Sequence, residues 1–210
     1  MLPRLYAILD AEALERLGLE LEDTALRLTE AGVRLLQYRD KRGDREVIWE
    51  AARRLADQLE GSGCLLILND HADLVVSSGF GGVHVGQGDV DAFAARSLIG
   101  AGRVLGVSTH SEGQLRAAAE SPADYVAIGP VFATGTKADA EPVVGVEGVR
   151  RARALTSKPL VAIGGITTLN VREVLDAGAD SVAVIGALFD GRRDVRVAAR
   201  ELLKAASESI

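Results

Sequence analysis

The chain has 210 residues, of which 48% are hydrophobic and 26% are charged, and its formal net charge is -6. This composition is typical of one globular domain with a large core and excludes a disordered chain. The acidic balance and the lack of a basic run argue against nucleic acid as a partner, so any anionic ligand must be held by a local positive site.

The single cysteine, Cys64, lies in an apolar segment and has no second cysteine for a disulfide within the chain, which favours a reducing compartment. The chain enters an apolar run at residues 5–9 with no signal-peptide pattern before it. No apolar run approaches the roughly 20 residues that a membrane span needs. We therefore expect a cytoplasmic protein without a membrane partner; the sequence leaves open whether it forms a homo-oligomer.

Short segments rich in Val, Ile and Leu recur along the chain without strict alternation of apolar and polar residues. Such segments are typical of strands that are buried on both faces, as in parallel sheets. We predict eight strands, at residues 5–9, 35–39, 65–68, 82–85, 104–107, 125–128, 160–163 and 181–185. Helical periodicity lies between them, at residues 21–31, 45–59, 92–99, 113–119, 146–155, 169–177 and 195–206, and more weakly at 71–78.

Strands that alternate with helices in this way predict a single-domain (β/α)₈ TIM barrel over residues 1–210, with short loops. A doubly wound open sheet is the competing architecture. Its first strand–helix turn would often carry a glycine-rich phosphate motif, and the turn around Asp10 carries none. The barrel is therefore the favoured fold.

Polar side chains follow the predicted strands at their carboxyl ends, the end at which barrel enzymes hold their active sites. Arg39, Lys41 and Lys137 are cations that can hold phosphate oxygens. Asp70 and Asp89 lack neighbouring His or Cys ligands, which excludes a typical zinc site and suits Mg²⁺. We infer one anionic group that is bound by cations and a metal.

A second anionic group is indicated near the end of the chain. Gly164, Gly165 and Gly186 leave backbone amides open ahead of the last two helices, where barrels often hold a phosphate.

Each of these residues also has an ordinary structural interpretation. Asp70 and Asp89 precede helical segments and could serve as helix N-caps. Arg39 and Lys41 could be surface cations with carboxylate partners. His84 lies inside a strand, and we interpret it as a hydrogen-bonded core histidine. The functional interpretation depends on the joint pattern, since all the candidates fall at one end of the strands.

Six spaced motifs resemble the thiamine-phosphate synthase family across nearly the whole chain: QYRDK (37–41), ND (69–70), GVHVGQGD (82–89), GVST (106–109), GPVFATGTK (129–137) and AIGGI (162–166). The resemblance implies a (β/α)₈ barrel transferase that joins an aminopyrimidine methyl diphosphate to a thiazole phosphate or its carboxylate. It also implies that thiamine phosphate and pyrophosphate are formed by a Mg²⁺-assisted dissociative substitution.

The resemblance also implies roles for single positions. The pyrimidine diphosphate would be held by the segment that contains Gln37, Tyr38, Arg39, Asp40 and Lys41, together with Asn69, Ser108 and Lys137. Of these, Arg39, Lys41, Ser108 and Lys137 would be the catalytic residues, and Asp70 and Asp89 would bind Mg²⁺. The thiazole phosphate would be held by Thr134, Gly135, Thr136, Gly165, Ile185 and Gly186.

Three positions depart from the family pattern. Tyr38 stands where an aliphatic residue is usual, Gly135 where proline is usual and Gly186 where serine is usual. None of these departures removes a charged group or a proposed metal ligand, although Gly135 should loosen its loop and Gly186 lacks a hydroxyl.

Three other functions stay open from the sequence. A thiazole tautomerase of the same fold would depend on proton transfer, for which His110 is placed at the end of a strand. A non-catalytic phosphate-binding relative would not need Asp70, Asp89 and Lys137 together. Another phosphate-binding barrel would share the glycines near the last two strands.

Overall fold

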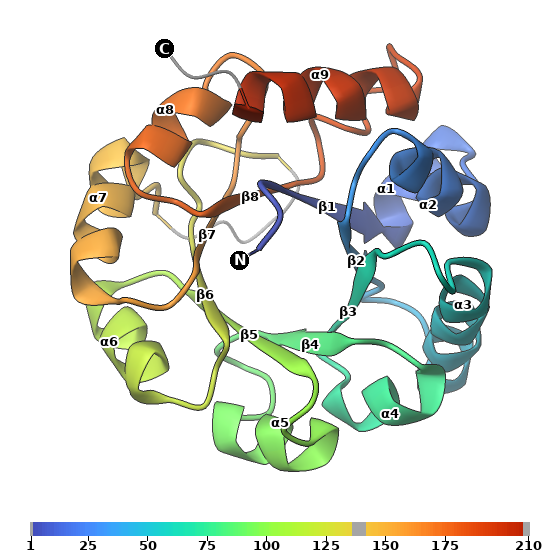
Figure 1. Cartoon of the computed structure of the whole chain (residues 1–210), viewed down its shortest axis with the longest axis horizontal. Coiled ribbons are helices and arrows are strands. Elements are labelled where there is room, and N and C mark those ends of the chain that lie inside the picture. The colour runs from blue at the N-terminus through green and yellow to red at the C-terminus, as the bar shows by residue number, and fades with distance from the viewer. Residues whose placement is uncertain (1, 136–141, 208–210) are drawn as a thin grey trace.

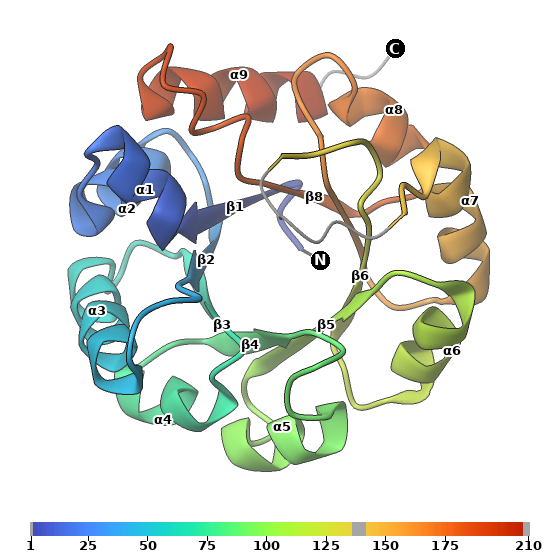
Figure 2. The ribbon, with the colours of Figure 1, turned by 180° about the vertical axis from the view of Figure 1, so that it is seen from behind.

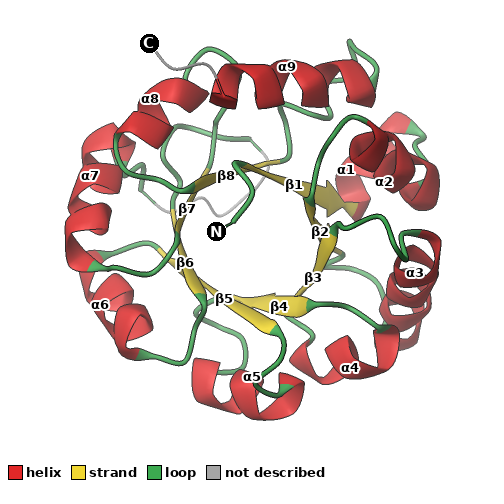
Figure 3. Cartoon of the chain, in the orientation of Figure 1, coloured by secondary structure: helices red, strands yellow, loops and turns green. Residues whose placement is uncertain are grey.

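The computed structural model describes residues 2–135 and 142–207. Eight parallel strands close into a barrel in chain order, and helices surround it (Figures 1 and 3). The predicted barrel is therefore confirmed. Because every strand runs in the same direction, all of the carboxyl ends lie at one end of the barrel. Residues 129–135, which follow β6 and are yellow in Figure 2, lie over the opening on the side shown there.

Four strands have the predicted bounds, and the other four end one or two residues away from the predicted position. They are β1 (Leu5–Asp10), β2 (Leu35–Arg39), β3 (Leu65–Asn69), β4 (Gly82–Val85), β5 (Val104–Thr109), β6 (Tyr125–Ile128), β7 (Leu160–Ile163) and β8 (Ser181–Val184). The helices are α1 (Ala11–Leu17), α2 (Leu21–Glu30), α3 (Arg45–Gln58), α4 (Val75–Ser78), α5 (Ala92–Ile99), α6 (Glu112–Glu120), α7 (Gly145–Leu155), α8 (Val171–Asp176) and α9 (Val195–Ser207).

Helix α1 was not predicted from the sequence. It begins directly after β1, where the Asp10 carboxylate accepts a hydrogen bond from the backbone amide of Ala13 at 3.0 Å and so caps the first turn. The helix ends at Gly18, whose φ of 62° gives the left-handed conformation typical of a C-terminal cap. The weak helical segment at 71–78 also differs, because it divides into a 3₁₀ turn at Ala72–Leu74 and the short helix α4.

The core has two layers, which explains why the strands are apolar throughout. In β1, Leu5 and Leu9 point outward and pack against the helices, whereas Tyr6 and Ile8 point into the barrel. The buried apolar and tyrosine side chains that fill the interior come from β1, β2, β3, β6, β7 and β8. Both faces of each strand are therefore buried, as expected for a barrel. Among the described residues, no helix has the length and apolar character needed to cross a membrane.

An arginine–aspartate contact stabilises the amino-terminal side of the barrel, opposite the polar ends. Asp180 lies just before β8, and its carboxylate accepts hydrogen bonds from the backbone amide of Leu160 at 2.8 Å and from Arg153 of α7 at 2.9 Å. Arg153 also donates to the carbonyls of Thr156 and Lys158. The Arg153 guanidinium thus joins α7, the loop that follows it and the residue before β8.

The same arrangement recurs earlier in the chain. Asp124, just before β6, accepts from the backbone amide of Leu105 at 2.7 Å and from Arg96 of α5 at 2.5 Å. Arg96 donates in addition to the carbonyls of Arg103 and Pro122. In both places an arginine of one helix holds the aspartate that lies just before a later strand.

We expect the substitution Arg153→Met to lower the free energy of unfolding by about 1–3 kcal/mol, because two carbonyls would lose this donor and the half-buried Asp180 carboxylate would lose its guanidinium partner. Arg150→Met is the matched control in the same helix. The side chain of Arg150 pairs with Glu147 at the surface, and its loss should cost under about 1 kcal/mol. Urea unfolding of both variants measures the difference. Equal effects would contradict the role given to Arg153.

Candidate functional site

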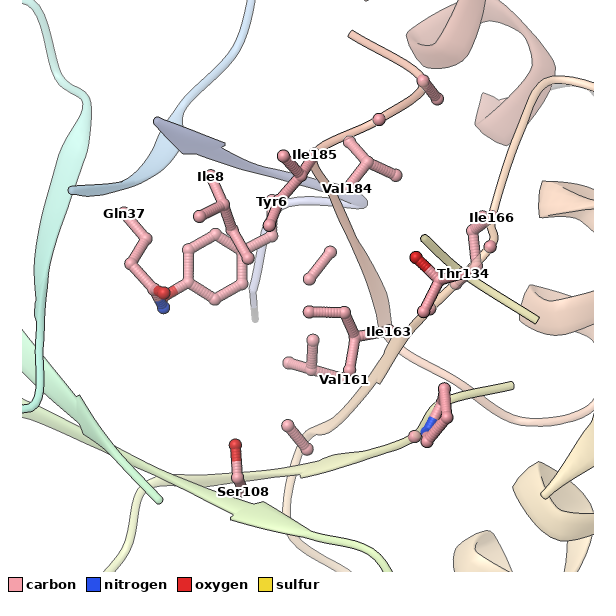
Figure 4. Close-up of a pocket in the computed structure, with 18 of the residues that line it drawn as sticks. Tyr6, Ile8, Gln37, Ser108, Thr134, Val161, Ile163, Ile166, Val184 and Ile185 are labelled. Carbon is pink, nitrogen blue, oxygen red and sulfur yellow. The ribbon is translucent and has the colours of Figure 1, made fainter. Parts of the chain in front are cut away.

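A cavity of about 410 Å³ opens at the carboxyl ends of the strands. Its wall contains apolar side chains of β1, β7 and β8, including Ile8, Val161 and Ile163, and polar groups from the other strands (Figure 4). Many of the residues selected from the sequence meet here. They are Gln37, Arg39, Asn69, Ser108, Thr134, Gly135, Gly165, Ile185 and Gly186.

Arg39 enters this cavity from the end of β2 and is fixed by a neighbouring strand. Its guanidinium pairs with the carboxylate of Asp10, and both side chains are largely buried. Asp10 is itself held in place because it caps α1. The ion pair fixes the direction of Arg39, while a guanidinium with five N–H donors keeps further donors for a ligand.

Lys41, Asp70 and Asp89 form a charged cluster beside the cavity. The Lys41 ammonium pairs with the carboxylate of Asp70, and the carboxyl groups of Asp70 and Asp89 share a hydrogen bond. Asp70 adopts a φ of 65°, and its backbone amide donates to the carbonyl of His84 at 2.8 Å, which places it against β4. The backbone amide of Gly86 donates to Asp89 at 2.7 Å. Two carboxyls from separate loops therefore meet at one point.

The two carboxyls have opposite pKa shifts. Burial, followed by the contact with Asp89, raises the pKa of Asp70, although Lys41 acts in the other direction. Burial also acts to raise the pKa of Asp89, but the hydrogen bonds from Asp70 and the Gly86 amide outweigh it, so that this pKa is lowered. Two carboxylates cannot face each other without a proton or a cation between them. The pair is therefore a site for a shared positive charge.

The structure does not support the alternative in which these aspartates are helix caps. The cap of α5 is Asp91, whose carboxylate accepts from the amides of Phe93 and Ala94. The 3₁₀ turn that follows Asp70 has no side-chain cap. Neither Asp70 nor Asp89 is therefore required for helix initiation.

Asn69, which ends β3, supplies an unusual buried group. Its side-chain Nδ2 has no hydrogen-bond partner within the described part of the chain, although the residue is only 7% exposed. An unpaired buried amide is costly. Because Asn69 lines the cavity, this donor indicates a polar ligand there.

Two glycines at the end of β7 let the preceding loop pack closely. The carbonyl of Gly164 accepts a hydrogen bond from the backbone amide of Phe132 at 3.0 Å. Gly165 has a φ of 64°, and a Cβ atom at this position would lie 2.7 Å from the carbonyl oxygen of Ala133. The backbone amides of Gly165 and Gly186 donate no hydrogen bond to another described residue. These amides can therefore receive an anion.

Two predicted residues, Tyr38 and Asp40, do not line this cavity, and two others lie outside the described residues. Tyr38 points outward into the layer between β2 and the helices, and its hydroxyl donates to Asp40 at 3.5 Å. Asp40 also accepts from the backbone amides of Arg42 and Gly43, so that it stabilises its own loop. Neither lines the cavity, since consecutive residues of a strand face opposite sides. Thr136 and Lys137 lie outside the described residues.

The sequence did not single out a row of hydroxyl and imidazole groups at the bottom of the cavity. Gln37 donates to the Tyr6 hydroxyl at 2.8 Å, and this hydroxyl lies 3.0 Å from that of Tyr125. His84 contacts Tyr125 through Nδ1 at 2.8 Å and Ser108 through Nε2 at 2.7 Å. The prediction of a hydrogen-bonded core histidine is thus confirmed, and His84 also lines the cavity. A tyrosine within an apolar strand was the available signal, because its buried hydroxyl needs a partner.

His110 directly follows β5 and also lines the cavity. Its Nδ1 contacts the carbonyl oxygen of Gly129 at 2.7 Å, and its backbone amide donates to Gln114 at 2.8 Å. A carbonyl only accepts, so Nδ1 carries a proton and Nε2 is left for other contacts.

Comparison with known proteins identifies the family. The model of the thiamine monophosphate synthase family matches residues 5–188. The chain is 51% identical over 190 residues to the thiamine-phosphate synthase of Koribacter versatilis, with 90% of each chain covered.

This chain belongs to the thiamine monophosphate synthase family.

Other members agree with the assignment. The thiamine-phosphate synthase of Shouchella clausii is 37% identical over 206 residues, with 98% of this chain and 97% of the other covered. The solved structure of thiamine phosphate pyrophosphorylase from Pyrococcus furiosus superimposes with a TM-score of 0.86 at 32% identity, over 97% of this chain and 95% of the other. The family resemblance seen in the six motifs is therefore confirmed along the whole barrel.

We expect Gly165→Ala to destabilise the protein by about 1–3 kcal/mol, because a side chain at positive φ is strained and its Cβ would overlap the Ala133 carbonyl. Gly102→Ala is the control, since a Cβ there meets nothing within 4 Å and its φ is not positive. Thermal unfolding compares the two. An unchanged Tm for Gly165→Ala would show that the loop can move away.

Proposed function

We propose that this chain catalyses the thiamine-phosphate synthase reaction. In this reaction an aminopyrimidine methyl diphosphate is joined to a thiazole phosphate or its carboxylate, and thiamine phosphate and pyrophosphate are formed. One observation carries the proposal. In this chain, which belongs to the family, side chains from separate strands converge on one cavity beside the Lys41, Asp70 and Asp89 cluster. The substrates are small molecules, and we place the reaction in the cytoplasm, as expected from the single cysteine.

The pyrimidine diphosphate would bind on the side of β2, β3 and β5. Arg39, held by Asp10, and Lys41 would contact the diphosphate, whose oxygens gain negative charge as the bond to the methylene carbon breaks. The unpaired amide of Asn69 and the hydroxyl of Ser108 would contact the same substrate. Groups that are already oriented before the reaction need little reorganisation in the transition state, which is the main source of electrostatic catalysis.

The residues of the charged cluster fit a hard divalent cation. Asp70 and Asp89 present carboxylate oxygens, the donor type that Mg²⁺ prefers, and their contact adds to burial in raising the pKa of Asp70. When bound, Mg²⁺ would neutralise charge on the departing pyrophosphate. Among residues 2–135 and 142–207 there is no group of three His, Cys, Asp or Glu side chains suited to a metal. Two carboxylates with substrate oxygens as further ligands agree with this finding.

The thiazole phosphate would bind between the loops that follow β6, β7 and β8. The backbone amides of Gly165 and Gly186 would hold its phosphate, and Thr134 and Gly135 line the same side. Ile185 belongs to the apolar wall nearby. The anchored phosphate would keep the thiazole nitrogen within reach of the methylene carbon, which converts a bimolecular step into an effectively unimolecular one.

The remaining predicted groups belong to the segment between β6 and α7. We propose that Lys137 contacts the pyrophosphate and that Thr136 contacts the thiazole phosphate, as the family motif implies. No covalent intermediate with the enzyme is needed, since the electron-rich pyrimidine stabilises the methylene cation.

The direct test is to mix the purified protein with both substrates and Mg²⁺ and to follow thiamine phosphate and pyrophosphate by chromatography. We expect both products in equal amounts and their loss with EDTA. Isomerisation of a thiazole carboxylate phosphate without pyrophosphate would instead support the tautomerase and a role for His110. No reaction in either assay would support a binding protein.

The metal cluster has its own test. We expect Asp70→Asn to lower turnover about a hundredfold or more and to raise the Mg²⁺ concentration needed, since several kcal/mol of charge stabilisation depends on the site. Asp73→Asn is a matched control, because Asp73 lies three residues further on and pairs with Arg45 at the surface. A magnesium titration of both variants decides the point. If both variants need the same Mg²⁺ concentration, Asp70 is not a ligand of the metal.

A further inference from the structure

The barrel interior contains a continuous chain of hydrogen bonds that reaches the cavity. It consists of Gln37, Tyr6, Tyr125, His84 and Ser108, which belong to five different strands. Both tyrosines are about 1% exposed or less. Figure 4 shows the two ends, with the amide of Gln37 at the Tyr6 hydroxyl and the hydroxyl of Ser108 directed toward the open space.

Packing keeps the members of this chain in place. The rings of His84 and Tyr125 are stacked, with centroids 5.6 Å apart, and the ring of Tyr6 meets Tyr125 edge-on at 6.1 Å. Gly106 provides the space for Tyr125, because a Cβ atom there would lie 2.0 Å from the tyrosine ring. The contacts are therefore set by the barrel and do not depend on a ligand.

The donor at the Gln37 end sets the direction in which each hydrogen bond of the row is donated. The Gln37 amide nitrogen only donates, so the Tyr6 hydroxyl accepts from it and uses its single proton toward Tyr125. The Tyr125 hydroxyl then donates to Nδ1 of His84. In the neutral imidazole this contact places the single ring proton on Nε2, where it is donated to Ser108 Oγ.

Both tyrosines keep their protons at neutral pH. Burial raises the pKa of Tyr6 and also that of Tyr125 well above the usual value for a phenol. Each hydroxyl therefore has one proton to donate. Every hydrogen bond from Gln37 to Ser108 is then donated in the same direction.

We propose that Tyr6, Tyr125 and His84 are positioning residues that direct the hydroxyl proton of Ser108 into the cavity. With its oxygen accepting from His84, Ser108 is a donor for an acceptor atom of the substrate, either a ring nitrogen of the pyrimidine or a diphosphate oxygen. The identity of this substrate rests on the proposed function. The direction of the hydrogen bonds does not depend on it.

The tautomer of His84 tests the direction without any substrate. In protein labelled with ¹⁵N-histidine, long-range proton–nitrogen spectra distinguish the nitrogen that carries the proton, and His84→Gln assigns the signals. We expect Nε2–H for His84 in the unmodified protein. The Nδ1–H form would reverse the hydrogen bonds from Tyr6 to Ser108, make Ser108 a donor to His84 and overturn the proposal.

A substitution at the far end tests whether Gln37 sets the direction. A carboxylate only accepts, so in Gln37→Glu at alkaline pH we expect the order of donors to reverse and His84 to change to the Nδ1–H form. Tyr38→Phe is the control, because the hydroxyl of Tyr38 lies outside the barrel wall near Asp40, and the His84 signals should not move. If His84 keeps the Nε2–H form in Gln37→Glu, Gln37 does not set the direction of the hydrogen bonds.

A double-substitution cycle tests the effect on binding of the pyrimidine diphosphate with Mg²⁺ by calorimetry. We expect Tyr125→Phe to weaken binding about two- to tenfold, the range of one neutral hydrogen bond, and to have no further effect when Ser108→Ala is already present. Equal weakening in both backgrounds would indicate a packing effect and contradict the proposal. If the unmodified protein does not bind this substrate although His84 shows Nε2–H, the proposed function fails while the direction stands.

Discussion

The closure of eight parallel strands is the constraint on which the site depends. Parallel strands place all of their carboxyl ends together, so residues that are far apart in the chain supply groups to one cavity. Gln37 and Gly186 illustrate the effect, since one lies in β2 and the other follows β8. The contacts of Arg96 and Arg153 at the other end hold the strands in this register without entering the site.

The charges at the carboxyl ends are arranged in pairs before any ligand binds. Arg39 is held by Asp10, and Lys41 by Asp70, which in turn faces Asp89. Such pairs fix long side chains that would otherwise lose conformational freedom on binding. The two cations face three carboxylates, so these described groups alone do not form a positive region. An anionic ligand would therefore depend on the further positive charge that Mg²⁺ would bring to Asp70 and Asp89.

The barrel interior is unusual because its polar groups are connected to one another. A buried hydroxyl without a partner would destabilise the fold, whereas a fully connected row is tolerated and specifies a single arrangement. Tyr6 and Tyr125 therefore have a structural role in the core as well as a connection to Ser108 at the cavity. Stability and ligand recognition depend on the same side chains here.

The sequence by itself determined the barrel, the order of its strands and the end at which the polar residues gather. These conclusions depend on local periodicity and on the position of each polar residue relative to its strand. Only the tertiary structure decided that Gln37 points inward and Tyr38 outward, and that Asp10 and Arg39 are partners. Strands buried on both faces show no alternation from which the inner face could be recognised. Contacts between distant strands arise only when the barrel closes, and for that reason they could not be derived from the chain alone.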